Sequence, residues 1–476
     1  MLAAARPARI IAPAMHDAPP ISAKKRVPPG AEAALGPLEA FDRWPGGRAL
    51  AAMVSVDGHR GAAAAAWART SMLTTPGAAT VRSASEARAA LDPLGECRAA
   101  IESPSHHGVI GAFSYELGRI LEPAAECSGR DFGAEPDRAH PAMTLHRAAG
   151  CIAFDGVTGA ASQWGDVPEL ASTPHHAEFA VGAFASTTGA AAYQRAVARA
   201  VEYIHAGDCF QVNLAHRLSA RFRGSVRSLA SRLFRAVGPA LGAYIEVPRA
   251  DGSVGSVIVS VSPELFLRFD ARSRTVTTRP IKGTRSAAEH ASALESSHKD
   301  AAELAMIVDL MRNDLGRTCE PASIRVDRPR DTEVFGRDPD SAVRHTVATV
   351  SGTVPRDRSV IDVMAAAFPP GSVTGAPKIR AMQIIDELEP VGRGPYCGAI
   401  AWFAPTGDAT LSVPIRTAVV HLDPGSTPTD ATGVIDLHVG AGIVADSDPR
   451  AEWIETLHKA GTILAPLGQD AMMVDR

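Results

Sequence analysis

Two stretches of the chain carry apolar residues at the spacing of an amphipathic helix. The first runs from residue 191 to 206 and is followed by Gly207, and the second runs from 297 to 317, where Gly316 closes the pattern. We expect each helix to pack its apolar stripe on a core and to expose its opposite face. The stripes are Tyr193, Val197, Val201 and Ile204 in the first helix, and Leu304, Ile307, Val308, Met311 and Leu315 in the second.

A run with the two-residue period of a strand follows the first helix. From Phe210 to Ala215, Gln211 and Asn213 alternate with apolar neighbours, so both amides should face the side opposite Val212. Buried amides need hydrogen-bond partners, and a ligand is one possible partner.

A predicted hairpin brings a carboxylate and an amine together. Two strands separated by a turn near residues 271 to 273 carry Glu264 and Lys282 at their outer ends. Pro280 lacks a ladder donor and Gly283 permits close approach of the backbone, so the second strand should end at an edge or a cleft. Glu264 and Lys282 could share that cleft.

The domain organisation follows from the length of the chain and from a change in the hydrophobic pattern near residue 189. A chain of 476 residues is longer than a single hydrophobic core usually becomes, so two lobes are expected. The first third carries short alternating segments that predict strands joined by turns, with no residues suited to catalysis. We expect a disordered tail over 1–29, an N-terminal lobe over 30–188 and a catalytic domain over 189–468.

Composition excludes several classes of partner. Charged residues make up 21% of the chain, and a formal net charge of −4 provides no basic field for nucleic acid or for a membrane surface. The six cysteines include no C-x-x-C pair, as expected of reduced thiols in a cytoplasmic protein. No run approaches the ~20 apolar residues that span a bilayer, and the start lacks the apolar segment of a secretory signal. A small molecule is the expected partner.

Two pairs of carboxylates recur at helical spacing. Asp300 and Glu303 lie three residues apart in the second predicted helix. Glu452 and Glu455 have the same spacing after Asp448-Pro449, which predicts an N-cap followed by a proline at the first helical position. Like charges at this spacing destabilise a helix unless a cation lies over them.

Two kinds of cation could balance these pairs. Lys299 and Lys459 each lie four residues from a glutamate of one pair, so simple salt bridges would suffice. A divalent cation bound by the carboxylates is the alternative, because hard oxygen ligands suit such an ion. The spacing alone leaves both possibilities open.

A loop rich in glycine and proline could bind an anion. Residues 368 to 376 lead into a helix that opens at Pro377 and carries Ile379, Met382 and Ile385 as its apolar positions. Free backbone N–H groups at such a helix start attract an anion, and a carboxylate is a reasonable ligand. The loop is not a Walker motif, because no Gly-Lys-Ser/Thr follows.

A second group of residues near the C-terminus is also suited to a carboxylate. Gly440, Ala441 and Gly442 predict a turn whose backbone N–H groups could contact it. Arg416, on a strand predicted from 411 to 420, could clamp the same carboxylate in a bidentate manner.

These stretches together resemble the chorismate-utilising enzymes, and within them the aminodeoxychorismate synthase type. The resemblance covers about residues 190 to 467 and is weaker in the N-terminal third. Its motifs are specific and occur in the family's order: 208–214 (DCFQVNL), 262–264 (SPE), 280–285 (PIKGTR), 307–317, 371–382 and 440–448.

The resemblance implies a fold and a cofactor. The fold would be α/β of the α+β type and two-lobed, with large antiparallel sheets packed face to face, helices outside and the active site between the lobes. Chorismate would be the substrate and Mg²⁺ the cofactor. Glu303 and Glu455 would bind the ion that grips the ring carboxylate, and Asp300 and Glu452 would support it.

The resemblance also implies which residues contact the substrate. The enolpyruvyl carboxylate would be held by Arg416, Tyr396 and the backbone of Gly440, Ala441 and Gly442. Ser372 would help to fix the ring end, and Thr284 would also contact the substrate. His345 would act as general acid on the departing 4-hydroxyl.

Lys282 is the position that separates activities within the family, because anthranilate synthases carry alanine there. The lysine amine would attack ring C2 and expel the 4-hydroxyl, after which ammonia attacks C4 and releases the lysine. The amine must be neutral to attack, so partial burial and the nearby Arg285 should lower its pKa. Glu264 would be the base. Gln211 replaces the lysine that the water-using isochorismate and salicylate synthases carry.

The source of ammonia follows from what the chain lacks. No segment resembles the cysteine elbow of a glutamine amidotransferase, so a separate glutamine amidotransferase subunit or free ammonia is expected. The implied activity is synthesis of 4-amino-4-deoxychorismate for 4-aminobenzoate and folate. An anthranilate synthase component I is the alternative enzyme, and a silent chorismate-binding partner is the non-enzymatic alternative.

Overall fold

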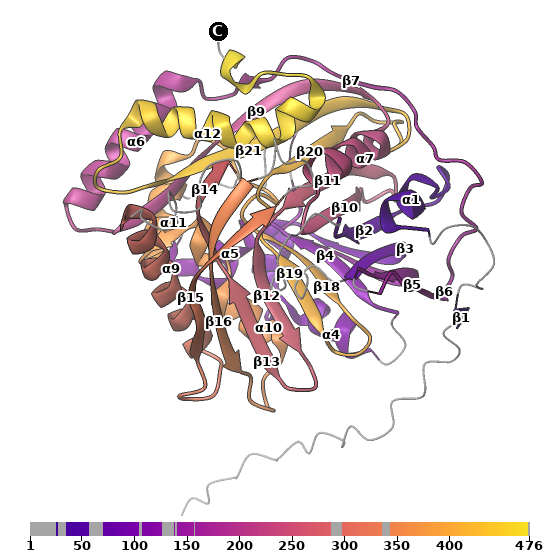
Figure 1. Ribbon diagram of the computed structural model, residues 1–476, viewed down its shortest axis with the longest axis horizontal. Coiled ribbons are helices and arrows are strands. Elements are labelled where there is room, and N and C mark those ends of the chain that lie inside the picture. Colours follow the sequence, from indigo (N-terminus) through magenta and orange to yellow (C-terminus); the bar gives the residue numbers. More distant parts are fainter. Residues whose placement is uncertain are drawn as a thin grey trace, which may run out of the picture.

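Long alternating strands build a sheet that is antiparallel at every strand pairing in the described part of the chain. The computed structural model describes residues 25–26, 35–56, 70–103, 107–125, 138, 140–156, 158–286, 298–335 and 343–474. The sheet curls so that two layers form, with helices on their outer sides (Figure 1). The predicted mixed α/β fold with large antiparallel sheets is therefore confirmed.

The first layer is built around two long strands that come from opposite ends of the predicted catalytic domain. In spatial order it contains β9 (Gln211–Gly224), β21 (Ala431–Ile443), β20 (Thr417–Leu422), β11 (Val254–Ser262), β10 (Leu241–Pro248) and β2 (Ala51–Val54). The short strands β7 (Phe179–Val181), β8 (Ala185–Ser186) and β17 (Gly375–Ala376) pair with the other edge of β9.

The second layer contains the predicted hairpin. In spatial order it consists of β4 (Val109–Phe113), β18 (Ala399–Phe403), β19 (Ala409–Ser412), β12 (Leu265–Asp270), β13 (Thr275–Arg279) and β16 (Val343–Thr353). β14 (Ile281–Ser286) continues along the same edge of β16 as β13, and β15 (Arg325–Phe335) pairs with the opposite edge.

Two bent strands connect the layers. β3 (Thr70–Arg82) pairs with β2 through its first half, and β5 (Met143–Asp155) pairs with β4 through its own first half. The two strands pair with each other along their length, with register shifts on either side of Pro76. Strands that change layers characteristically bend at such bulges. The short strands β6 (Ala161–Gly165) and β1 (Lys25–Arg26) extend this edge.

The two layers enclose a core of their own. One cluster of buried residues joins Ala51 and Met53 of β2 and Ala243 and Ile245 of β10 to Ile110 and Ala112 of β4 and Ile400 and Trp402 of β18. These residues alternate along their strands, so one face of each strand points into the space between the layers. The other faces pack against helices in the larger cluster.

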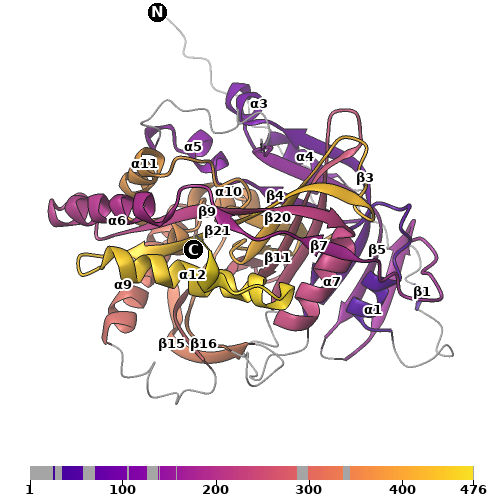
Figure 2. The same cartoon turned by 90° about the horizontal axis from the view of Figure 1, so that it is seen from above.

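Helices cover the outer sides. α6 (Ala190–His205) and α12 (Pro449–Leu464) lie over β9 and β21 (Figures 1 and 2), and α9 (His298–Gly316) lies on β15 and β16. The two helices predicted from apolar spacing are α6 and α9. The others are α1 (Pro37–Asp42), α3 (Ala84–Ala89), α4 (Gly95–Glu102), α5 (Leu117–Leu121), α7 (Val226–Val237), α10 (Val360–Ala367) and α11 (Lys378–Leu388). In the described part of the chain, no helix is both long and apolar enough to cross a membrane.

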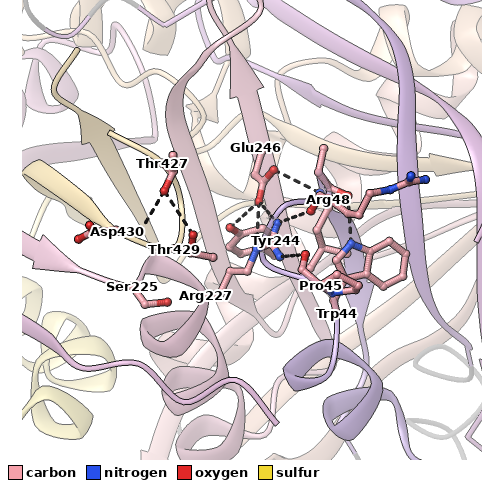
Figure 3. Close-up of polar contacts among 12 residues, drawn as sticks. Trp44, Pro45, Arg48, Ser225, Arg227, Tyr244, Glu246, Thr427, Thr429 and Asp430 are labelled. Atoms are coloured by element: carbon pink, nitrogen blue, oxygen red, sulfur yellow. Dashed lines mark hydrogen bonds and ion pairs between the residues drawn. The ribbon is translucent and has the colours of Figure 1, made fainter. Parts of the chain in front are cut away.

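A buried ion pair fixes the N-terminal segment to the first layer (Figure 3). Arg227 of α7 binds Glu246 of β10 at 2.9 Å and also donates to the backbone carbonyls of Pro45 and Arg48. Tyr244 donates to the same carboxylate at 2.9 Å. Because every charge of this buried group has partners, it holds the turn before β2 in one position.

The domain limits at 30, 188 and 468 stay a prediction.

Candidate active site

The site lies where the chain passes twice between the layers. Residues 263–264 lead from β11 to β12, and residues 413–416 lead from β19 to β20. The two segments bind each other: Ser262 Oγ donates to the carbonyl of Val413 at 2.6 Å, and Val413 N donates to the carbonyl of Glu264 at 3.0 Å. These crossings bring Glu264 and Arg416 into the interior.

The crossing at 413–416 corrects one prediction. A continuous strand was expected from 411 to 420, but β19 ends at Ser412 and β20 begins at Thr417. Arg416 has a φ of +50°, a conformation that non-glycine residues rarely adopt, and its carbonyl accepts from Val261 N at 3.0 Å. The change of layer between the two strands explains the interruption.

Glu264 is a buried carboxylate with defined donors. Its side chain accepts from Ser372 Oγ at 2.5 Å and from the backbone N–H of Ile281. Burial raises the pKa of Glu264 to about 7, although Ser372 and the charge of Lys282 oppose that rise. A carboxyl with such a pKa can take up or release a proton near neutral pH.

Lys282 is aimed by a bulge in β14. Lys282 pairs with Thr346 and Thr284 with His345, so Gly283 is an extra residue, and its φ is +73°. Lys282 is partly buried, and burial lowers the pKa of its amine against the opposing charge of Glu303. Glu264 and Lys282 lie close enough for the charge of each to shift the pKa of the other, as expected of neighbouring side chains. The side chains of Thr284 and Arg285 lie outside the described residues.

The amine of Lys282 lies against the face of β21 in the first layer. A Cβ placed on Gly442 would lie 3.6 Å from Lys282 Nζ and 2.9 Å from Gln211 Nε2. A Cβ on Gly440 would lie 3.1 Å from the hydroxyl of Tyr396. Both glycines therefore let these side chains approach the backbone of β21 closely, where a larger residue would clash. They lie within β21, so the turn predicted at 440–442 is a strand, and the alternate Ala441 faces the core on the other side.

The predicted faces of Gln211 and Asn213 are confirmed. Gln211 is fully buried, and neither its Oε1 nor its Nε2 has a hydrogen-bond partner among the described residues. The Nδ2 of Asn213 is also buried without a hydrogen-bond partner among the described residues. Val212 and Leu214 pack into the core on the opposite face. Buried amides without partners next to Lys282 indicate a place for a polar ligand.

Three of the four predicted metal ligands have described side chains. Glu303 of α9 is half-buried and Glu455 of α12 is exposed, and both carboxylates are close enough to raise the pKa of Lys282. Glu452 is buried and accepts from Ser447 Oγ at 2.5 Å. Asp300 lies in α9, with its side chain outside the described residues. No three His, Cys, Asp or Glu side chains among the described residues are grouped so as to hold a metal ion.

Lys459 forms the salt bridge that its spacing from Glu455 predicted, and it makes a second contact that was not predicted. Its Nζ binds Glu455 at 2.7 Å, which is the simple salt bridge, and it also donates to the carbonyl of Gly440 at 2.9 Å. Its charge further lowers the pKa of Lys282. The N-cap predicted at Asp448 is confirmed, because its side chain accepts from Ala451 N at 2.8 Å. This cap starts α12 so that Glu455 and Lys459 come close to Lys282.

His345 is held as a neutral imidazole. It lies on β16, is 1% exposed, and binds the backbone of Gly283. Burial lowers the pKa of His345 to about 3, and the charge of Arg416 lowers it further. Burial also lowers the pKa of Arg416, to about 10, so that side chain remains charged at neutral pH.

Sequence reasoning missed Arg393, which lies behind the site. Arg393 is 1% exposed and binds Glu389 at 2.6 Å, and it donates to the carbonyls of Asn213 and Val373. Its guanidinium lies 6.0 Å from the centre of the ring of Tyr396. Glu389 and Arg393 are four residues apart, but α11 ends before them, so helical periodicity gave no signal.

The loop predicted to bind an anion, residues 368 to 376, contacts a carboxylate of the protein itself. Residues 371–373 form a short 3-10 helix (η3), and Ser372 in it binds Glu264. α11 begins after Pro377, as predicted, and the side chain of Lys378 is buried against Asp314 at 2.8 Å. Ile379, predicted on the apolar face, is 40% exposed because that face of α11 begins at Ala381.

The fold and the sequence motifs are those of a chorismate binding enzyme. A family model with that description matches residues 56–465, so the chain belongs to the family, as its motifs predicted. Among curated relatives, aminodeoxychorismate synthase component 1 of Salmonella typhimurium is 35% identical over 76% of this chain and 77% of its own length. Anthranilate synthase component 1 of Streptomyces coelicolor is 36% identical over 76% and 73%.

A solved structure supports the fold independently. Anthranilate synthase component I from Streptococcus pneumoniae superposes with a TM-score of 0.67 at 24% identity, covering 91% of this chain and all of that one. At this identity the likeness concerns the fold. The arrangement of two layers and outer helices is thus shared with a chorismate-utilising enzyme.

Proposed function

We propose that this protein transfers ammonia to C4 of chorismate and forms 4-amino-4-deoxychorismate. The observation that carries the proposal is the amine of Lys282, which is partly buried and lies among the carboxylates of Glu264, Glu303 and Glu455. The relative from Salmonella typhimurium that is named aminodeoxychorismate synthase component 1 supports it. The family resemblance implies that members of the anthranilate type carry alanine at this position.

Lys282 would be the nucleophile. Its neutral amine would form a bond to ring C2 while both ring double bonds shift and the C4–O bond breaks, releasing the hydroxyl as water. Ammonia would then form a bond to C4 as both double bonds shift back and the C2–N bond to Lys282 breaks. The net reaction consumes chorismate and ammonia and releases water.

Glu264 would carry the protons of these steps. A carboxylate with a pKa of about 7 can accept a proton from the attacking amine or from ammonia and return it. Ser372 would hold this carboxylate in position. His345 would protonate the departing hydroxyl, which requires that the bound, anionic substrate raise its pKa from about 3.

Magnesium would be held by Glu303 and Glu455, with Asp300 and Glu452 in support. The described residues suit this ion, because Mg²⁺ keeps several waters and needs only one or two protein carboxylates beside its substrate. Glu303 and Glu455 come from separate helices and both face Lys282. The ion would fix the ring carboxylate of chorismate. It would compete with Lys459 for the carboxylate of Glu455.

The remaining predicted residues would hold the enolpyruvyl carboxylate. Arg416 supplies a partly buried cation at the crossing, and Tyr396 reaches the strand face at Gly440. Gln211 and Asn213 offer donors without partners at the same face. We further propose that a separate glutamine amidotransferase subunit supplies the ammonia, which the designation component 1 of the relative from Salmonella typhimurium supports.

Product analysis tests the proposal. Purified protein is incubated with chorismate, Mg²⁺ and an ammonium salt at alkaline pH, and the products are separated. We expect 4-amino-4-deoxychorismate from the wild type, and none when glutamine replaces ammonium without a partner. Anthranilate and pyruvate would instead establish the second candidate activity, which the relative from Streptomyces coelicolor favours. No consumption of chorismate under these conditions would overturn both.

A further inference from the structure

One edge of β9 has no partner strand where it passes the site. On the edge that faces away from β21, β17 and β8 pair with β9 at either end, and between them, at residues 213–217, no described strand covers it. Two side chains take the place of a strand there. Glu389 accepts from Ala215 N at 2.8 Å, and Arg393 donates to the carbonyl of Asn213 at 2.7 Å.

The guanidinium of Arg393 joins this edge to two other parts of the site. It donates to the carbonyl of Val373 at 3.1 Å, and Val373 follows Ser372 in η3. Its Cζ lies 6.0 Å from the centre of the ring of Tyr396. Both carboxylate oxygens of Glu389 accept from it, at 2.6 and 2.9 Å, so the buried guanidinium is held in one orientation.

Each of the three contacted segments carries a side chain that the proposed mechanism uses. β9 carries Asn213, η3 carries Ser372, which donates to Glu264 at 2.5 Å, and the segment that follows Arg393 carries Tyr396. The guanidinium contacts each segment at that residue or at its neighbour. A change in the position of the guanidinium would therefore move all three side chains relative to one another.

We propose that Arg393 is a positioning residue for the reaction, which holds η3 and β9 at the spacing where Ser372 donates to Glu264 and Asn213 faces the substrate. The inference rests on the proposed function, in which Glu264 is the base. Arg393 would act through the backbone of the two segments and not by touching the substrate. Lysine cannot replace it, because a compact ammonium cannot span a carboxylate and two separate carbonyls as the planar guanidinium does.

The chain contains a matched arginine away from the site. Arg227 is also buried, binds Glu246 through two nitrogens and donates to the carbonyls of Pro45 and Arg48 (Figure 3). The two arginines thus make the same kinds of contact, with one glutamate and two carbonyls. Arg393→Lys and Arg227→Lys should therefore lose comparable stability, and a difference in activity between them reports on positioning.

Steady-state kinetics compare the two variants. In Arg393→Lys we expect kcat/KM for chorismate to fall roughly 10- to 100-fold, because a displacement of about 1 Å in positioned groups has an effect of this size. Arg227→Lys should retain most of the wild-type activity when both variants are assayed well below their unfolding temperatures. Equal losses in the two variants would overturn the positioning role.

A second measurement follows Glu264 without turnover. The infrared band of its protonated carboxyl, obtained as the difference from Glu264→Gln, gives its pKa in each protein. The hydrogen bond from Ser372 lowers the pKa of Glu264. Displacement of η3 in Arg393→Lys should therefore raise that pKa, by up to the shift of about 1 unit expected for loss of the bond. In Arg393→Lys combined with Ser372→Ala, the pKa should be no higher than in Ser372→Ala alone.

Both lysine variants leave the other groups around this carboxyl in place. Ionisable groups that face it include Lys282, Arg416 and Cys397. Arg227→Lys should accordingly leave the pKa of Glu264 unchanged. An unchanged pKa in Arg393→Lys, or an equal shift in both variants, would contradict the inference. If the wild type consumes no chorismate, the proposed function fails, and the infrared titration alone decides whether Arg393 positions Ser372.

Discussion

Ser372 donates a hydrogen bond to Glu264 at 2.5 Å, although the two residues lie 108 positions apart in the chain. The bond joins the loop before α11 to the crossing between the layers. It also stabilises the ionised form of a buried carboxyl that lies close to Lys282.

Loss of this hydrogen bond should change the pH dependence of the reaction. Ser372→Ala removes a donor that lowers the pKa of Glu264 from its burial-raised value, so that pKa should rise above about 7. The acidic limb of the kcat profile should move to higher pH by about 1 unit, because a hydrogen bond to a charged group is worth about 1.5–3 kcal/mol. Ser262→Ala, which contacts only backbone atoms of this segment, should leave the limb in place.

Substitutions at Lys282 can distinguish a nucleophilic amine from a side chain that only supplies a positive charge. Lys282→Ala should lower 4-amination by at least about 10²-fold, and Lys282→Arg should be as poor, because guanidinium stays protonated and cannot attack. Lys459→Met removes a second amine from the same cleft and should cost less. The measurement is the rate of 4-amino-4-deoxychorismate formation. Near-wild-type product from the arginine variant would refute the covalent mechanism.

Magnesium binding can be tested at the two facing glutamates. Glu303→Gln and Glu455→Gln should each abolish activity at low Mg²⁺ and raise the Mg²⁺ requirement by at least about tenfold, since even outer ligands cost 10–100-fold. Stabilisation of the fold by Mg²⁺ should weaken in parallel, as measured by thermal unfolding. Asp309→Asn, an exposed carboxylate of the same helix α9, is the control. Full turnover by either glutamine variant at low Mg²⁺ would remove these residues from the metal site.

Arg393 should matter for stability as well as for the site. Arg393→Met leaves Glu389 as an unpaired buried charge, so we expect a loss of about 3–5 kcal/mol in the free energy of unfolding measured with urea. Arg393→Met combined with Glu389→Gln should recover part of it. Arg199→Met, which breaks an exposed pair with Glu202, should change stability little. Equal effects of the buried and the exposed substitution would contradict this account.

The sequence predicted those features that depend on local periodicity. α6, α9, the cap of α12 and the opposite faces of Gln211 and Val212 follow from spacing within a few residues. The motifs predicted the family. The crossings at 263–264 and 413–416 were missed because they depend on which distant strands pair. Ser372 was assigned to the substrate alone, and only the folded chain shows that it binds Glu264.

The pairing of β9 with β21 also constrains how the chain becomes folded. Val212 of β9 pairs with Ile443 of β21, which is one of the last strands to be synthesised. The edge of β9 therefore stays uncovered until synthesis of the chain is almost complete. Contacts between such distant segments form slowly. Until then a long strand with an apolar face presents unpaired backbone groups, which is the arrangement most prone to associate with other chains. Chains that end before Ala431 should therefore aggregate rather than survive as fragments.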